Sequence, residues 1–206
     1  MRLAMLLLLV LAAGCGPRLL PGPGANEVEG RGEGAATSAK GIELVARARA
    51  WEGDPWNLSE RVTPMVVTIA NEGDVPVHIR YYDIRLFSDA GRAYFPLRPF
   101  APGAEPALAA RESHFRPEKF TYAPYFSTHF GDASRQDAFA DPELPTADMA
   151  RKALPEGVLQ PGGKVSGFLY FEEVGPDVRR VRLLADFDNS ETGWRVARLA
   201  IPFLML

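Results

Sequence analysis

The sequence contains a single cysteine, Cys15, among 206 residues. A disulfide within the chain would need a second thiol, so the fold must be held by a hydrophobic core and not by covalent cross-links. Long hydrophobic runs are also lacking, because the most apolar stretch, residues 3–13, is little more than half of the ~20 residues that a membrane-spanning helix needs. These absences exclude a disulfide scaffold, and they exclude a membrane-spanning helix formed by that stretch.

An excess of positive charge is lacking as well. The chain has 23 Lys and Arg against 26 Asp and Glu, a formal net charge of −3. Proteins that bind nucleic acid or anionic membranes through charge carry a basic excess that is gathered in one region. The arginines here are scattered along the sequence, so we expect neither nucleic acid nor a charged polymer as a partner.

Catalytic motifs are absent too. The sequence has no Gly-x-Ser-x-Gly elbow, no phosphate-binding loop and no GxGxxG dinucleotide fingerprint. Its three histidines, His78, His114 and His129, follow no HxH or HxxxH spacing, whereas a metal site needs three or four ligands that converge. We therefore predict that the protein is not an enzyme, and we expect no catalytic residue, no cofactor and no metal ligand.

The chain does contain the alternation of apolar and polar residues that is typical of β-strands. Several such runs are bounded by turn residues and little helix is indicated, which predicts a mainly β fold, an antiparallel sandwich. In the third run the apolar phase slips near Tyr82 and Asp83, which predicts a β-bulge. The expected strands are residues 42–50, 62–70, 75–87, 93–97, 164–172, 178–188 and 194–203.

Acidic residues come in pairs near the end of the chain. Asp186 and Asp188 are two positions apart on an expected strand, so they share one face with Arg180 and Arg182. This pattern indicates a solvated stripe of charge and not a catalytic pair.

Residues 98–158 form an aromatic-rich insertion between the strands. Thr146 is a suitable N-cap for one short helix that should end before Pro155. Exposed aromatic rings are costly, so the insertion either packs over an open end of the sandwich or presents a partner-binding surface. The residues that would form that surface are Phe115, Phe120, Tyr122, Tyr125, Phe126 and Phe130.

The N-terminal residues resemble those of bacterial lipoprotein precursors. Arg2 precedes the apolar run 3–13, and the small residues Ala12, Ala13 and Gly14 stand directly before Cys15. A charge, an apolar run and a small-residue cleavage site make a signal peptide. The resemblance implies that residues 1–14 are removed and that Cys15 is acylated.

This resemblance also implies a partner and an address. Acyl chains on Cys15 would make the lipid bilayer a partner and would place the domain outside the cytoplasm, in the bacterial cell envelope. Gly16 stands where an aspartate is associated with retention in the inner membrane, which favours the outer membrane. Residues 15–40 are rich in Gly and Pro, which predicts a flexible tether of roughly 25–30 Å and a folded domain over residues 41–206.

Three further stretches resemble an Ig-like domain of uncharacterised function that is common on bacterial lipoproteins. They are a strand that ends at Asn71 before a small turn, the hairpin of residues 87–95, and the Leu-Gln-Pro-Gly turn that starts at Leu159. The resemblance covers residues 42–97 and 159–203 and implies an Ig-like β-sandwich without catalytic residues. It favours a module that binds an envelope protein or has a structural role, the alternative being a carrier of a small ligand or metal.

Overall fold

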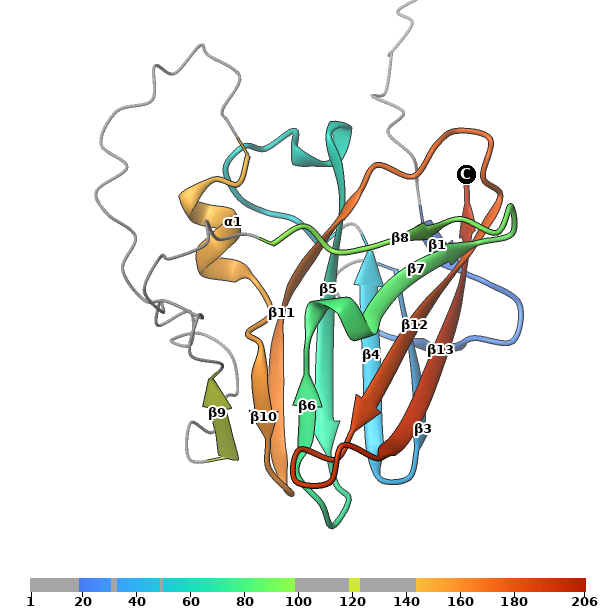
Figure 1. Cartoon of the computed structure of the whole chain (residues 1–206). Coiled ribbons are helices and arrows are strands. Elements are labelled where there is room, and N and C mark those ends of the chain that lie inside the picture. The colour runs from blue at the N-terminus through green and yellow to red at the C-terminus, as the bar shows by residue number, and fades with distance from the viewer. Residues whose placement is uncertain (1–18, 31–32, 49, 99–118, 123–143) are drawn as a thin grey trace, which may run out of the picture.

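The computed structural model describes residues 19–30, 33–48, 50–98, 119–122 and 144–206. Within these residues the chain is mainly β, with antiparallel sheets and one α-helix, as the alternating pattern predicts (Figure 1). Two five-stranded sheets pack against each other, and a three-stranded sheet adjoins them. No helix in this part of the chain is long and apolar enough to cross a membrane.

The first sheet, sheet A, has the strand order β1-β13-β12-β7-β8, and every neighbouring pair is antiparallel. Its two hairpins, β7–β8 and β12–β13, follow the turn residues of the sequence. The strands are β1 (Leu19–Pro21), β7 (Ile84–Ser88), β8 (Ala93–Tyr94), β12 (Arg180–Asp188) and β13 (Arg195–Met205).

Sheet B has the order β11-β5-β4-β3-β2, and sheet C has the order β6-β10-β9. Sheet B consists of β2 (Asn26–Val28), β3 (Gly34–Ala39), β4 (Ile42–Ala48), β5 (Val62–Asn71) and β11 (Gly163–Glu172). Sheet C consists of β6 (Val77–Ile79), β9 (Phe120–Tyr122) and β10 (Gly157–Leu159).

The main hydrophobic core lies between sheets A and B. Leu44 of β4 and Ile69 of β5 are fully buried in it together with Leu183 and Phe187 of β12. These residues occupy alternate positions of their strands, so each of the two sheets turns one face inward and the other outward. The outward faces of the two sheets are therefore the surfaces on which a site could be built.

The prediction of one bulged strand over residues 75–87 is wrong in detail. A single 3-10 turn, η2 (Tyr81–Asp83), separates β6 from β7, and the two strands belong to different sheets. The Tyr81 hydroxyl donates to the carbonyl oxygen of Leu154, and the Tyr81 N–H donates to the buried carboxylate of Glu156. These bonds fix the Tyr81 ring inward and let the chain pass from sheet C to sheet A.

The prediction of a flexible tether is wrong for the residues from Leu19 onward. Leu19 is only 2% exposed and pairs with Met205, so β1 is an edge strand of sheet A. The small residues of β3 allow close packing, since a Cβ on Gly34 would lie 2.6 Å from the Arg47 side chain. The folded body therefore includes the described residues from Leu19 onward, and Gly34 marks close strand packing in this region.

The predicted short helix is confirmed. It is α1 (Ala147–Lys152), and the Thr146 hydroxyl oxygen accepts a hydrogen bond from the Met149 N–H, as an N-cap does. Besides α1, the 3-10 turn η1 (Leu58–Glu60) precedes β5. Both elements lie over the outward face of sheet B, where they bury residues of a second hydrophobic cluster.

Candidate functional site

The aromatic residues that the sequence singled out fall mostly outside the described residues. The described residues do not include four of the six aromatic residues, Phe115, Tyr125, Phe126 and Phe130. The predicted acylation site, Cys15, also lies outside them. Phe120 is 6% exposed and belongs to the main core, and Tyr122 pairs through its backbone with Gly157 of β10. Phe120 is therefore a core residue, and its ring does not offer a surface contact to a partner.

The outward face of sheet B is covered by the chain itself. Phe168 and Tyr170 of β11 point away from the main core into the second cluster, which also contains Met149. The Trp51 ring meets both aromatic rings edge-on, with centroid distances of 5.1 and 5.7 Å, and the Tyr170 hydroxyl donates to the Met149 carbonyl oxygen over 2.8 Å. The Lys152 Nζ lies over the Trp51 ring, 5.0 Å from its centre.

Polar contacts fasten this cover to the loop before β5. The Thr146 hydroxyl donates to the Asp54 carbonyl oxygen, and the Asp54 N–H donates to the Asp148 carboxylate. Partial burial disfavours the ionised form of Asp148, but hydrogen bonds from Lys152, the Asp54 N–H and Arg151 outweigh it and hold the Asp148 pKa below its ordinary value. These polar groups are satisfied by one another, so the covered face of sheet B is a structural unit.

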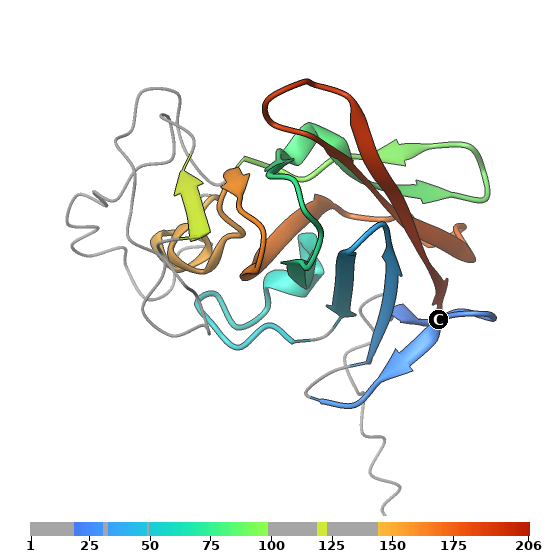
Figure 2. The same ribbon diagram turned by 90° about the horizontal axis from the view of Figure 1, so that it is seen from below.

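The outward face of sheet A has no described segment over it (Figure 2). Odd-numbered residues of β12 are buried in the core, so its even-numbered residues point outward. We call this surface the open face; register places on it Leu20, Arg85, Phe87, Arg180, Arg182, Leu184, Asp186, Asp188, Arg198, Ala200, Pro202 and Leu204.

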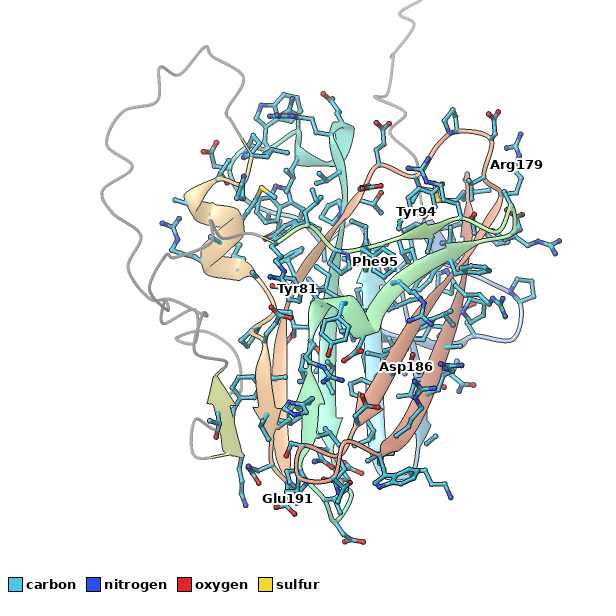
Figure 3. The ribbon with its side chains drawn as sticks, viewed as in Figure 1. Tyr81, Tyr94, Phe95, Arg179, Asp186 and Glu191 are labelled. Carbon is cyan, nitrogen blue, oxygen red and sulfur yellow. The ribbon has the colours of Figure 1, made fainter. Side chains whose placement is uncertain are left out.

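A network of ion pairs occupies the half of the open face that adjoins sheet C (Figure 3). Asp186 accepts hydrogen bonds from Arg198 over 2.6 and 3.1 Å, and Arg85 approaches it to 3.4 Å. Asp188 pairs with Arg80 over 2.6 Å, and Arg80 also pairs with Asp83. The network joins β7, β12, β13 and η2 through alternating positive and negative side chains.

The surroundings shift the pKa values of these carboxyl groups in opposite directions. Partial burial opposes ionisation of Asp186, but the Arg198 hydrogen bonds and the charges of Arg195 and Arg85 prevail and lower its pKa. For Asp83, burial outweighs the Arg80 hydrogen bond and raises the pKa. Asp186 is thus held as an anion for ion pairing, which is the opposite of what a general acid needs.

The other half of the open face contains two arginines without an acidic partner among the described residues. Arg180 and Arg182 are exposed, and neither makes an ion pair with a described carboxylate. Arg182 lies 5.9 Å from the ring centre of Phe87, and Arg180 stands opposite Leu204 in the β12–β13 register. The predicted charged stripe of β12 is therefore divided, because its acidic residues pair with arginines of neighbouring elements and not with Arg180 or Arg182.

Sequence reasoning placed these arginines on one face but missed their apolar neighbours. Leu20, Leu204 and Pro202 are partly buried beside them; Leu20 comes from β1, far away in the sequence, and Leu204 and Pro202 come from β13, whose register with β12 decides which side chains are neighbours. The alternation along one strand predicts which side of the sheet each residue faces. It does not predict which residues of other strands lie beside the arginines, because that depends on strand pairing and register.

The described residues hold no group of three His, Cys, Asp or Glu that could bind a metal. His78 lies in β6, where burial and the nearby charge of Arg80 lower its pKa, while His114 and His129 lie outside the described residues. The chain matches no known protein family, and comparison with curated proteins and with solved structures finds no match.

Proposed function

We propose that this protein is a bacterial envelope lipoprotein, held in the bilayer by acyl chains on Cys15. Its Ig-like β-sandwich would act outside the cytoplasm as a non-catalytic module, with a structural role or a role in binding an envelope protein. The outer membrane is the favoured location. The open face of sheet A is the surface that such a module would use.

The observation that carries this proposal is the spacing between Cys15 and the folded body. A small-residue stretch after an apolar run ends at Cys15, and only three residues separate Cys15 from Leu19, where β1 begins. Each buried methylene of an acyl chain contributes about 0.8 kcal/mol, and two or more chains anchor a protein stably. A cysteine placed in this way joins a lipid anchor directly to a folded domain.

A non-catalytic role is supported by the state of the charged side chains. Asp186, Asp188 and Asp148 are each held by arginine or lysine, and the buried Glu156 accepts a hydrogen bond from the Tyr81 N–H. A general acid or base needs a proton that is free to move and a pKa close to the working pH. These carboxylates hold neighbouring elements of the fold together.

The test is incorporation of labelled palmitate in a bacterial host, with Cys15→Ala as the variant. We expect the parent protein to carry the label and to be recovered with membranes. We expect Cys15→Ala to lack the label and to yield no mature protein in the membrane fraction. Ser38→Ala, an exposed substitution in β3, is the matched control and should behave like the parent. Palmitate label that persists in Cys15→Ala, or its absence from the parent, would contradict the proposal.

A further inference from the structure

We infer that the half of the open face around Arg180 and Arg182 lies against the headgroups of the bilayer, where the two arginines pair with lipid phosphates. We call this half the arginine patch; it comprises Leu20, Phe87, Arg180, Arg182, Pro202 and Leu204. The inference rests on the proposed lipid anchor at Cys15 and adds an orientation to it.

The first argument is reach. Four Cα–Cα steps of 3.8 Å join Cys15 to Leu19, so the Leu19 Cα lies within about 15 Å of the Cys15 Cα. Leu19 is also the first residue of β1, which is an edge strand of sheet A, fixed by its pairing with β13. An anchor at Cys15 therefore holds this edge of sheet A close to the bilayer surface.

The second argument is position within the sheet. Leu20 pairs with Leu204, and Leu204 pairs with Arg180, so one row of residues runs across β1, β13 and β12. Neighbouring strands are about 4.8 Å apart, which places the Arg180 Cα roughly 10 Å from β1. Figure 1 shows the C-terminus at this same end of the sandwich, and Figure 3 shows Arg179 there and Glu191 at the opposite end.

The third argument is chemistry. A guanidinium group binds phosphate oxygens through two parallel hydrogen bonds, and among the described residues no carboxylate pairs with Arg180 or Arg182 and competes with a phosphate. The apolar atoms of Leu20, Leu204 and Phe87 lie beside them at partly buried positions, a combination suited to the boundary between water and lipid.

The surrounding charges restrict which surface can make the contact. Asp89 lies in the β7–β8 turn and Asp177 lies before β12, and both are exposed at this end of the molecule. They disfavour an approach through the tip of the sandwich, so the flat face carries the contact. In the half around Asp186 the arginines are already paired with aspartates, so this half attracts an anionic surface less than the arginine patch does.

Two arginines suffice here because the protein is tethered. Each basic residue near an anionic leaflet favours the bound orientation about fivefold, so two favour it about thirtyfold. A tether makes this an intramolecular choice between orientations, which needs far less attraction than capture from solution. The chain from Cys15, which lacks Arg2 and so has 22 Lys and Arg against 26 Asp and Glu, can therefore lie on the membrane by one face despite its negative net charge.

The experiment uses the chain from Cys15 to Leu206, which contains every described residue, coupled through the Cys15 thiol to a maleimide lipid. The vesicles contain phosphatidylglycerol and phosphatidylcholine in equal parts, with a trace of lipid that bears a photoreactive headgroup. After illumination, mass spectrometry maps the labelled peptides. We expect label on peptides that contain residues 180–184 and 200–206, and at least tenfold less on residues 40–43 and 189–194.

The variant Arg180→Glu with Arg182→Glu should lose this preference tenfold or more. The matched control is Lys40→Glu with Lys164→Glu, which makes the same change in charge at exposed positions of the β3–β4 turn and of β11 and should label like the parent. Equal labelling of both ends in the parent, or label that is insensitive to the arginine variant, would overturn the inference and leave the patch to a protein partner. Because coupling is chemical, a failure to acylate Cys15 in cells would defeat the proposed function and leave this result standing.

Discussion

The outward faces of the two large sheets, A and B, differ in what lies over them. On sheet B, the aromatic residues Phe168 and Tyr170 are covered by α1 and by the loop that contains Trp51. On sheet A no described segment covers the face, and charged side chains of alternating sign replace a cover over half of it. The aromatic residues on the outward face of sheet B are therefore buried by other segments of the chain, whereas the open face of sheet A is left accessible to solvent or to a partner.

Within sheet A a second difference follows from strand register. Asp186 lies beside Arg198 of β13 and Asp188 lies beside Arg80, which directly precedes η2, whereas Arg180 and Arg182 lie beside Leu204, Pro202 and Phe87. In the first half, arginines and aspartates are joined in ion pairs, whereas in the second half the guanidinium groups lie among apolar atoms and pair with no described carboxylate. Substitutions can therefore test whether the ion-paired residues stabilise the fold while Arg180 and Arg182 do not.

The largest effect is expected from truncating the covered aromatic surface. Phe168→Ala should lower the free energy of unfolding by about 3–5 kcal/mol, because it leaves a cavity beneath Trp51 and α1. Phe87→Ala is the matched change on the open face and should cost less than about 1 kcal/mol. Urea unfolding followed by circular dichroism measures both, and equal losses would contradict the distinction between the faces.

Removing the charge at the centre of the ion-pair network should have an intermediate effect. Asp186→Asn is expected to cost about 1–2 kcal/mol at neutral pH, since hydrogen bonds from Arg198 to a carboxylate are lost while the arginines remain hydrated. Asp177→Asn, an exposed carboxylate in the turn before β12, is the control and should change stability by less than about 0.5 kcal/mol.

The same substitution predicts a pH dependence. The folded-state pKa of Asp186 lies below its ordinary value, so its stabilising contribution is complete above about pH 4 and is lost as the pH falls through the folded-state pKa. The stability difference between the parent and Asp186→Asn should therefore shrink below about pH 4. Unfolding curves at neutral and acidic pH would reveal it, and a difference that grows on acidification would argue against an ion-pairing role.

A smaller effect is expected where α1 is attached to sheet B. Thr146→Ala removes the N-cap acceptor and the hydrogen bond to the Asp54 carbonyl oxygen, and should cost about 1 kcal/mol. Thr146→Ser keeps the hydroxyl group and should restore most of the loss. If serine and alanine were equally destabilising in thermal unfolding, the hydroxyl would not be what fixes the helix to the loop.

The smallest effect on stability is expected at the arginine patch. Replacing both Arg180 and Arg182 with Glu should change the free energy of unfolding by no more than about 0.5 kcal/mol, because neither side chain has an ion-pair partner among the described residues. Arg198→Ala is the contrast, since it breaks the hydrogen bonds to Asp186 and should cost more. A loss of 2 kcal/mol or more in the Glu variant would make the patch part of the fold.

Local patterns were enough to predict the parts of the fold that follow from one segment at a time. The strands β4, β5, β11, β12 and β13 come from period-two alternation, and α1 comes from the Thr146 cap. Phe120 could not be assigned from the sequence, since an aromatic residue that fills a core and one that binds a partner have the same composition signal.

Features that depend on the pairing of separate segments could not be predicted from the sequence. The strands β1, β2 and β3 lie in a segment rich in Gly, Ala and Pro, and they are strands only because β13 pairs with β1, β4 pairs with β3, and β3 pairs with β2. The change of sheet at Tyr81 depends on hydrogen bonds to Leu154 and Glu156, more than 70 residues away. The pairing of Asp186 with Arg198 depends likewise on the register of a hairpin.

Mass spectrometry of the N-terminal peptide, taken from protein extracted from membranes, tests the central claim most directly. An acylated Cys15 four residues before β1 is what would give the open face of sheet A its orientation toward the bilayer. The account predicts a first residue that is Cys15, with a mass increased by a diacylglyceryl group. A peptide that begins at another residue, or an unmodified Cys15, would contradict it.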